Sequence, residues 1–412
     1  MAKKSAFPFA FMLMLSLCPL ISVEIPRFLA FWPALIGIIF GAWYVFGLKQ
    51  KLIIPKTYVI GAGCICALIL LSTLWSISPE NALKDALKVT AILGLSGIFV
   101  ALCKSVDSDD FRPYFHFIPI GVGLAALLIL LELACDMPIY RLVRGISFNE
   151  NANTAEMNRG IVCVVISYFI ALGFLSRFRT KTHYILRITL SIIIGMMLLF
   201  SQSQSGQLAF VLGLITFFVF PARYKISYHV LATVIILSII LTPPLAVFLY
   251  TSLIMHGQDL PWLQDAYAGN RVEIWHFITK YAMSSPLYGY GIEATRYVDH
   301  FEHAQIYHHD DTVLHPHNFA VQIWMEFGAI GALFASFLFY KVFKTLSKTC
   351  DNHAQKYLVA ALIPILLVAS VAYGMWQSWW IGELIILYSI SGILINSEAS
   401  PKNTITPNNN LP

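Results

Sequence analysis

The sequence predicts an all-α polytopic membrane protein with about twelve transmembrane helices, on the basis of its composition and of how its apolar residues are grouped. Hydrophobic residues make up 58% of the 412-residue chain and charged residues 12%, whereas about a quarter of a soluble domain is charged. The mean hydropathy is +0.71, and the apolar residues form blocks of about 20, the length that crosses a bilayer. This composition excludes a soluble enzyme, a disordered scaffold and a disulfide-stapled secreted module.

Twelve apolar blocks mark the candidate spans. They lie near residues 7–23, 28–47, 58–77, 86–103, 115–135, 160–176, 185–200, 206–220, 228–250, 317–340, 356–374 and 379–395. The chain therefore divides into nine spans over 1–250, a long polar loop over 251–316, three spans over 317–395, and a tail, 396–412, whose composition predicts disorder. Pro243 and Pro244 predict a kink in the ninth span or its end.

The basic residues predict the orientation in the membrane. With the N-terminus inside, eighteen of the 27 Lys and Arg residues fall in the inner segments and nine in the outer ones. The positive-inside rule then places both termini in the cytoplasm and the long loop on the outer side of the membrane, with lipids around the spans. Because this distribution follows topology, the net charge of +5 does not indicate a nucleic-acid partner.

The loop 251–316 contains eight acidic residues, three basic residues and seven of the twelve histidines. Residues 271–283 have the spacing of a short amphipathic helix, which Pro286 and the Gly289-Tyr290-Gly291 turn should end. The histidines and carboxylates further along could bind zinc, but their spacing does not define a coordination geometry. We therefore expect no metal and no cofactor. These side chains are His300, His303, His308, His309, Asp310 and Asp311.

The motif His315-Pro316-His317-Asn318 stands where the long loop meets the tenth span. Pro316 suits the first turn of a helix, and the positive end of that helix would keep His317 in the same turn neutral. A neutral imidazole at the membrane boundary can act as a general base. The alternative is a histidine that only caps the helix.

Arginines on the same side could hold a phosphate. Arg271 opens the amphipathic helix of the loop, and a guanidinium binds phosphate oxygens in bidentate fashion. Arg159 and Arg296 are further outer arginines that could contribute. Each of them alone could equally contact lipid headgroups, so the hypothesis depends on a base and a phosphate clamp occurring together.

Four local patterns resemble the O-antigen ligase family, which includes lipopolysaccharide ligases and related polymerases. They are Arg271-x-x-Ile274-Trp275, Pro286-x-x-Gly289-x-Gly291, His315-x-His317-Asn318 and Glu326-x-Gly328-x-x-Gly331. The resemblance implies a type C glycosyltransferase-like fold in a bacterial inner membrane, and transfer of a glycan from undecaprenyl pyrophosphate to a lipid A-core sugar at the periplasmic face. It also implies that His317 is the catalytic histidine and Arg271 the loop arginine, with His315 and Asn318 orienting them.

The chain departs from the family pattern after the seventh span, where Gln204 stands at the position of a common arginine. A glutamine can donate hydrogen bonds to phosphate but carries no charge, so Arg159 could supply the second anion contact. A ligase is favoured over a polymerase, because the chain has a single long loop and a short tail. A transporter or lipid flippase is the alternative from another class, with Glu326 and Glu383 as its ion sites.

Overall fold

The computed structural model describes residues 2–256, 268–298, 306–307, 312–348 and 353–399, and these residues form helices and connecting segments without a β-strand. The α-helices are α1 (Ala2–Ser16), α2 (Cys18–Glu24), α3 (Trp32–Ala42), α4 (Lys56–Ser72), α5 (Pro79–Ser105), α6 (Ser108–Phe111), α7 (Phe117–Ala134), α8 (Pro138–Arg144), α9 (Asn158–Leu175), α10 (Lys181–Phe200), α11 (Gln204–Val219), α12 (Lys225–Ile240), α13 (Thr242–Leu249), α15 (Ala268–Ala282), α16 (Phe319–Lys348), α17 (Ala354–Val371) and α18 (Ser378–Ala399).

Short 3-10 and π segments extend or join these helices. They are η1 (Pro26–Ala30), η2 (Trp43–Gly47), η3 (Thr73–Trp75), η4 (Arg112–Tyr114), η5 (Thr154–Met157), η6 (Tyr250–Met255) and η7 (Ala294–Tyr297).

Each of the twelve predicted blocks corresponds to helix, but not every one is long enough to count as a span. Within the described ranges, nine helices have the length and composition to cross a membrane, and a bent pair would make ten. The apolar helices Trp32–Gly47 and Gln204–Val219 are shorter. The polytopic membrane class is therefore confirmed, while the number twelve stays a prediction.

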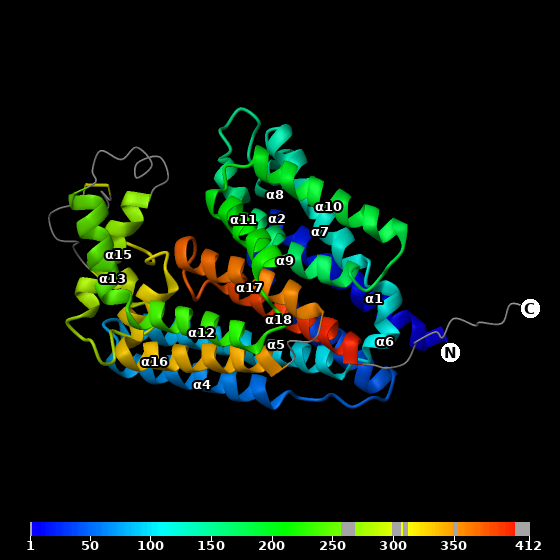
Figure 1. Cartoon of the computed structure of the whole chain (residues 1–412), viewed down its shortest axis with the longest axis horizontal. Helices are drawn as coiled ribbons and strands as arrows, with labels where there is room; N and C mark the ends of the chain where they lie inside the picture. The colour runs from blue at the N-terminus through cyan, green and yellow to red at the C-terminus, as the bar shows by residue number, and fades with distance from the viewer. Residues whose placement is uncertain (1, 257–267, 299–305, 308–311, 349–352, 400–412) are drawn as a thin grey trace, which may run out of the picture.

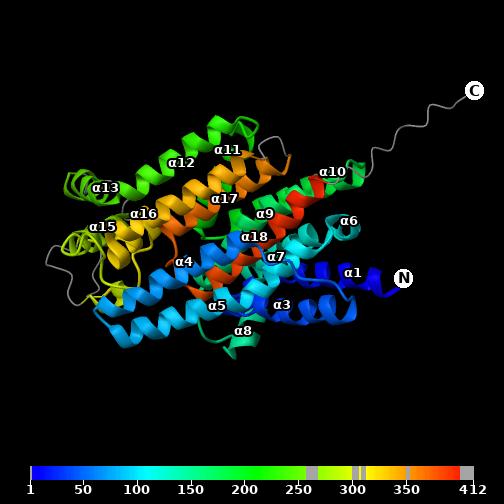
Figure 2. The same cartoon turned by 90° about the horizontal axis from the view of Figure 1, so that it is seen from below.

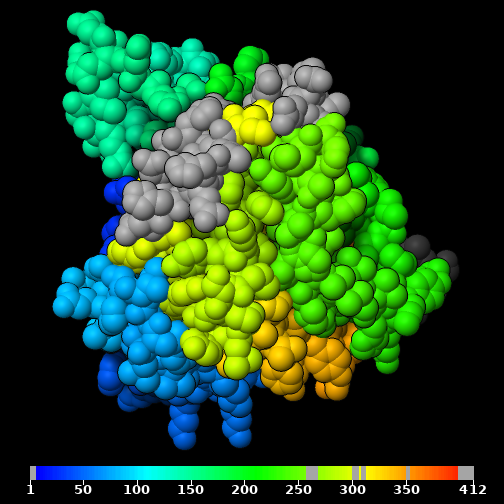
Figure 3. Space-filling model, turned by 90° about the vertical axis from the view of Figure 1, so that its left-hand side faces the viewer, coloured from blue at the N-terminus to red at the C-terminus, as the bar shows by residue number. Residues whose placement is uncertain are grey.

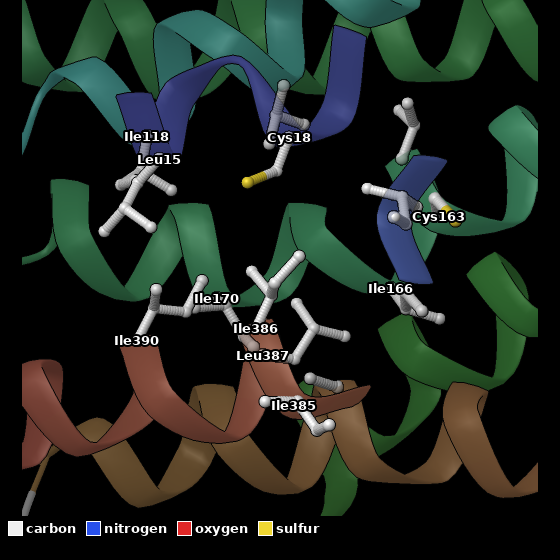
Figure 4. Packing of buried hydrophobic residues seen from close by; sticks show 14 of the residues in the cluster. Leu15, Cys18, Ile118, Cys163, Ile166, Ile170, Ile385, Ile386, Leu387 and Ile390 are labelled. Carbon is white, nitrogen blue, oxygen red and sulfur yellow. The ribbon is translucent and has the colours of Figure 1, made fainter. Parts of the chain in front are cut away.

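The helix α9 forms the centre of the bundle, and 89% of its apolar window is buried (Figures 1 and 2). An apolar helix can be covered by lipid or by other helices, and α9 is covered by helices, because it packs against α2, α7, α10, α11, α17 and α18. Figure 4 shows part of this core, where Cys163, Ile166 and Ile170 of α9 lie between Cys18 of α2 and the isoleucines of α18. The core positions the ends of these helices, from which the site is built.

A cap covers one end of the bundle, at the left of Figure 1. It consists of α13, η6, α15 and the segment 286–298, and Figure 3 looks onto it. The chain bends by 70° between α12 and the helix that follows, Thr242–Met255, which confirms the kink predicted from Pro243 and Pro244. The helix predicted over 271–283 is also confirmed, as α15.

Three tryptophans stand where the last two spans meet the outer interface, a position that predicts an aromatic belt at the membrane surface, but they face the protein interior. Trp376, Trp379 and Trp380 are 8%, 4% and 2% exposed. They belong to the main hydrophobic core instead, because the connection between α17 and α18 folds into the protein rather than along its edge. This connection lines the candidate site.

Candidate active site

His317 does not lie in the first turn of α16, so that prediction was wrong. The side-chain oxygen of Asn318 accepts hydrogen bonds from the backbone N–H groups of Ala320 and Val321, at 2.9 and 3.2 Å. Asn318 is therefore the N-cap, a position that asparagine favours strongly, and the helix begins at Phe319. His317 precedes the cap in a left-handed conformation with φ 53°.

The His317 ring is oriented by a backbone carbonyl. Its Nδ1 lies 2.6 Å from the carbonyl oxygen of Ala372, in the connection between α17 and α18. A carbonyl oxygen can only accept a hydrogen bond, so Nδ1 carries the proton, and in the neutral ring the basic lone pair is on Nε2. This is the tautomer that a general base acting through Nε2 requires.

His315 packs beside His317, with the two ring centres 4.3 Å apart. Burial, together with the neighbouring His317 and Arg296, lowers the pKa of His315 to about 3. Its Nδ1 is buried without a hydrogen-bond partner, and its Nε2 lies 3.5 Å from the Gln377 amide nitrogen. His315 is therefore neutral at physiological pH and cannot exchange protons there.

The helix α15 is docked against the histidine motif. The indole N–H of Trp275 donates to the carbonyl of Pro316 at 2.9 Å. On another side, the buried Glu273 carboxylate accepts the backbone N–H groups of Ile306 and Tyr307 at 2.7 and 2.8 Å. The Trp275 bond therefore joins the Arg271-x-x-Ile274-Trp275 pattern to the histidine motif.

Arg271 presents a cation that the described part of the chain does not neutralise. The side chain is half-buried near the start of α15, and no ion pair or hydrogen bond with another described residue involves its guanidinium. Burial lowers the pKa of Arg271 below its usual value, while Tyr373 acts in the opposite direction. A guanidinium in this state is suited to an anionic ligand.

Tyr373 is a site residue that the sequence did not single out. Burial raises the pKa of its phenol, and the Cys163 thiol adds to this, whereas the charges of Arg159 and Arg271 oppose the shift. Both arginines thus act on one hydroxyl, next to the carbonyl that holds His317. The sequence predicts a span over 356–374, which includes Tyr373. In the structure α17 ends at Val371, so Tyr373 lies just beyond the membrane helix.

The other predicted site residues, Arg296, Arg159 and Gln204, have surroundings that differ from one to the next. Arg296 forms an ion pair with Glu293 at 2.9 Å, so part of its charge is already compensated although it lies close enough to lower the pKa of His315. Arg159 is 3.9 Å from Glu156 in a loose, solvent-accessible pair. Gln204 is exposed at the first residue of α11, which packs against the start of α9 where Arg159 lies, through Gly206 and Ile161.

The loose histidine and aspartate cluster considered for zinc, His300, His303 and His308 to Asp311, lies outside the described residues. Within the described ranges, no group of three or more His, Cys, Asp or Glu side chains could hold a metal ion.

Comparisons with known proteins show which sequences this chain is similar to. The model of the O-antigen ligase family matches residues 188–336, from α10 into α16. The match supports assigning the chain to the O-antigen ligase family. The matched range includes Gln204, Arg271 and the histidine motif, but neither Arg159 nor Tyr373.

Curated relatives from two bacteria are each named "Putative polysaccharide ligase". The protein of Rickettsia bellii is 27% identical over 342 residues, which cover 80% of this chain and 78% of the relative. The protein of Rickettsia felis is 24% identical over 335 residues, covering 80% and 78%. No solved structure matches the chain. The family match and the names of these relatives support a polysaccharide ligase function.

The two glycine patterns of the family have a structural explanation here. Gly328 interrupts α16 with φ 56° and ψ −149°, and the segment 286–291 fills the break. The N–H groups of Tyr290 and Gly291 donate to the carbonyls of Met325 and Glu326, both at 2.9 Å. A Cβ atom at Gly289 or Gly328 would come within 2.5 to 2.6 Å of the opposing backbone. The glycines therefore join the loop to the helix that carries the histidines.

Proposed function

We propose that this protein is an O-antigen ligase, which transfers a preassembled glycan from undecaprenyl pyrophosphate to a sugar hydroxyl of lipid A-core at the periplasmic face of the inner membrane. The observation that carries the proposal is that His317 has a fixed tautomer and that no described residue neutralises the charge of Arg271. The first is suited to accept a proton through Nε2, and the second to hold a pyrophosphate. The family match and the names of the relatives support the same activity.

In the proposed reaction, His317 Nε2 accepts the proton of the acceptor hydroxyl while the hydroxyl oxygen attacks the anomeric carbon of the donor. The bond between that carbon and the pyrophosphate oxygen breaks, and undecaprenyl pyrophosphate leaves with the electron pair. Arg271 stabilises the negative charge on the leaving group, with Arg159 and the Tyr373 hydroxyl as further contacts. Attack from the face opposite the leaving group inverts the configuration of the anomeric carbon.

No metal is required by this scheme, because pyrophosphate is a good leaving group that needs no protonation. Most of the acceleration would come from holding two lipid-linked substrates in line and from the fixed positive charges. His315 would pack against His317 without exchanging protons. Gln204 could donate hydrogen bonds to the donor phosphates.

The test is complementation of a deletion strain, with lipopolysaccharide analysed on gels. The His317→Ala variant should leave core without polymer, while lipid-linked polymer accumulates, at normal amounts of inserted protein. The matched control is His229→Ala, because His229 is an exposed histidine of α12 that should be dispensable. Polymer attached to core in the His317→Ala strain would remove His317 from the mechanism, and a deletion strain that retains core plus one repeat would indicate a polymerase.

A further inference from the structure

The connection between α17 and α18, residues 372–377, touches both histidines of the site. The carbonyl of Ala372 binds His317, and Gln377 lies against His315. Gly374 lets the backbone approach closely, since a Cβ atom there would lie 3.0 Å from the His315 ring. The position of this connection therefore decides where the Nε2 atom of His317 points.

The same connection is held from its other side by α16. The backbone N–H of Met375 donates to Gln322 Oε1 at 2.8 Å, and the indole N–H of Trp376 donates to Glu326 Oε2 at 2.5 Å. Gln322 Nε2 donates to Glu326 Oε1 at 2.7 Å. Gln322 and Glu326 are 1% and 0% exposed, and their i, i+4 spacing puts them on one face of the helix.

We propose that Gln322 and Glu326 are positioning residues, which fix the 372–377 connection and thereby orient His317 for proton transfer. The inference rests on the proposed role of His317 as the base. It assigns Glu326 a function different from an ion site, because both of its carboxylate oxygens are already used as acceptors within the protein. The helix α16 thus carries the histidine motif just before its start and the support for its ring acceptor one and two turns later.

The direction of each hydrogen bond in this network is determined by chemistry. A backbone N–H and an indole N–H can only donate, so Gln322 must present its oxygen to Met375 and its nitrogen to Glu326. Residue 326 must then accept twice. The Glu326→Gln variant has nearly the same shape, but one of the two carboxylate oxygens is replaced by an NH2 group. That group faces another N–H donor, either Gln322 Nε2 or the Trp376 indole, and the hydrogen bond there is lost.

Exchanging the two side chains restores every bond. In the double variant Gln322→Glu/Glu326→Gln, the carboxylate at 322 accepts from Met375 and from the new amide nitrogen at 326, whose oxygen accepts from Trp376. The exchange therefore separates a need for this hydrogen-bond pattern from a need for a carboxylate at position 326 itself.

The experiment measures transfer by the purified full-length protein in detergent, with the strain's own lipid-linked polysaccharide and lipopolysaccharide core as substrates. For Glu326→Gln we expect kcat to fall about 10- to 100-fold, the size of effect that a misplaced catalytic group produces, with an unchanged KM for the donor. The double variant should recover to within a few-fold of the natural protein. The control is Glu383→Gln, a buried carboxylate held by Ser167 at 3.1 Å, which should retain normal kcat.

Two results would overturn the inference. A Glu326→Gln variant with normal kcat would show that the network does not orient His317. A double variant as inactive as the single one, with both proteins folded and inserted, would show that the carboxylate at 326 is needed in its own right. The proposed function is tested separately, because an active His317→Ala protein would reject the base whatever the Glu326 variants do.

Discussion

At the scale of single residues, three contacts hold His317 and its backbone in place. A left-handed backbone costs on the order of 1 kcal/mol or more for a residue with a side chain. This conformation persists because hydrogen bonds fix the groups on both sides of it. Asn318 caps α16, Trp275 binds the carbonyl before it, and Ala372 binds its ring. The orientation of the base is therefore determined by three elements that are distant in sequence.

His315 should make the protein sensitive to acid. Its pKa of about 3 in the folded state is below the value of about 6.5 expected in the unfolded chain, so the unfolded state binds a proton that the folded state does not. Stability from this source is complete above pH 6.5 and falls as the pH decreases toward 3. The loss at pH 5 should be roughly 1 to 2 kcal/mol.

The His315→Gln variant removes this titration. We expect its unfolding temperature in detergent to decrease less between pH 7 and pH 5 than that of the natural protein, measured by the same thermal scan. An identical decrease in both proteins would mean that His315 is not buried in its neutral form.

At the scale of elements, the break in α16 connects the cap to the membrane helices. The backbone of Gly328 lies in a region that is essentially restricted to glycine, and the carbonyls of Pro286 and Leu287 accept the N–H groups of Ala329 and Ile330, at 2.8 and 3.1 Å. The break thus lets an outer loop pair with a helix that runs into the membrane. The prolines at the start of α13 have a comparable effect, since the bend there brings α13 against α15.

The Gly328→Ala variant should therefore lower the unfolding temperature and the transfer activity together. Both the positive φ and the close backbone, 2.6 Å from a new Cβ atom, oppose the methyl group, for a total cost of more than about 1 kcal/mol. Gly392→Ala in α18 is the matched control, because a Cβ atom there meets nothing within 4 Å. Equal thermal stability of the two variants would contradict this account of the break.

At the scale of the whole molecule, the cap and the site occupy one end of the helix bundle (Figures 1 and 3). Several helix termini meet at this end. Ala372, after α17, contacts His317, before α16. Gly291 of the cap lies against Ser72, at the end of α4, and Ser76, before α5. A polymer too large to enter the bundle could reach a site at this end directly. The proposed function requires that this end face the periplasm.

Reporter fusions test that orientation. Alkaline phosphatase is active only outside the cytoplasm, so a fusion after Ser284 should be active and a fusion after Arg223 inactive, as the distribution of basic residues predicts. The reverse pattern would place the cap in the cytoplasm and reject the proposed function, while leaving the helix packing unaffected.

Much of the candidate site could be predicted from the sequence, because its signals are local. The helix of Arg271, the kink at Pro243 and Pro244, and the histidine motif each depend on a few neighbouring residues. The start of α16 was predicted too early, in a turn that includes His317. The preference of Pro316 for a first turn is outweighed by the N-cap hydrogen bonds of Asn318. The tryptophans were misplaced because an apolar aromatic near a span end has the same composition whether it faces lipid or protein.

By itself, the sequence determined a polytopic helical membrane protein whose motifs, with His317 and Arg271, resemble those of the O-antigen ligase family, because hydropathy and short motifs are properties of contiguous residues. Only the tertiary structure decided the tautomer of His317, the neutrality of His315, the entry of Tyr373 into the site and the hydrogen bonds of Gln322 and Glu326. Each of these depends on groups from segments that are distant in the sequence, such as Ala372 and His317, which are 55 positions apart, or Trp376 and Glu326, which are 50 apart. Burial and hydrogen-bond direction arise only when such groups meet.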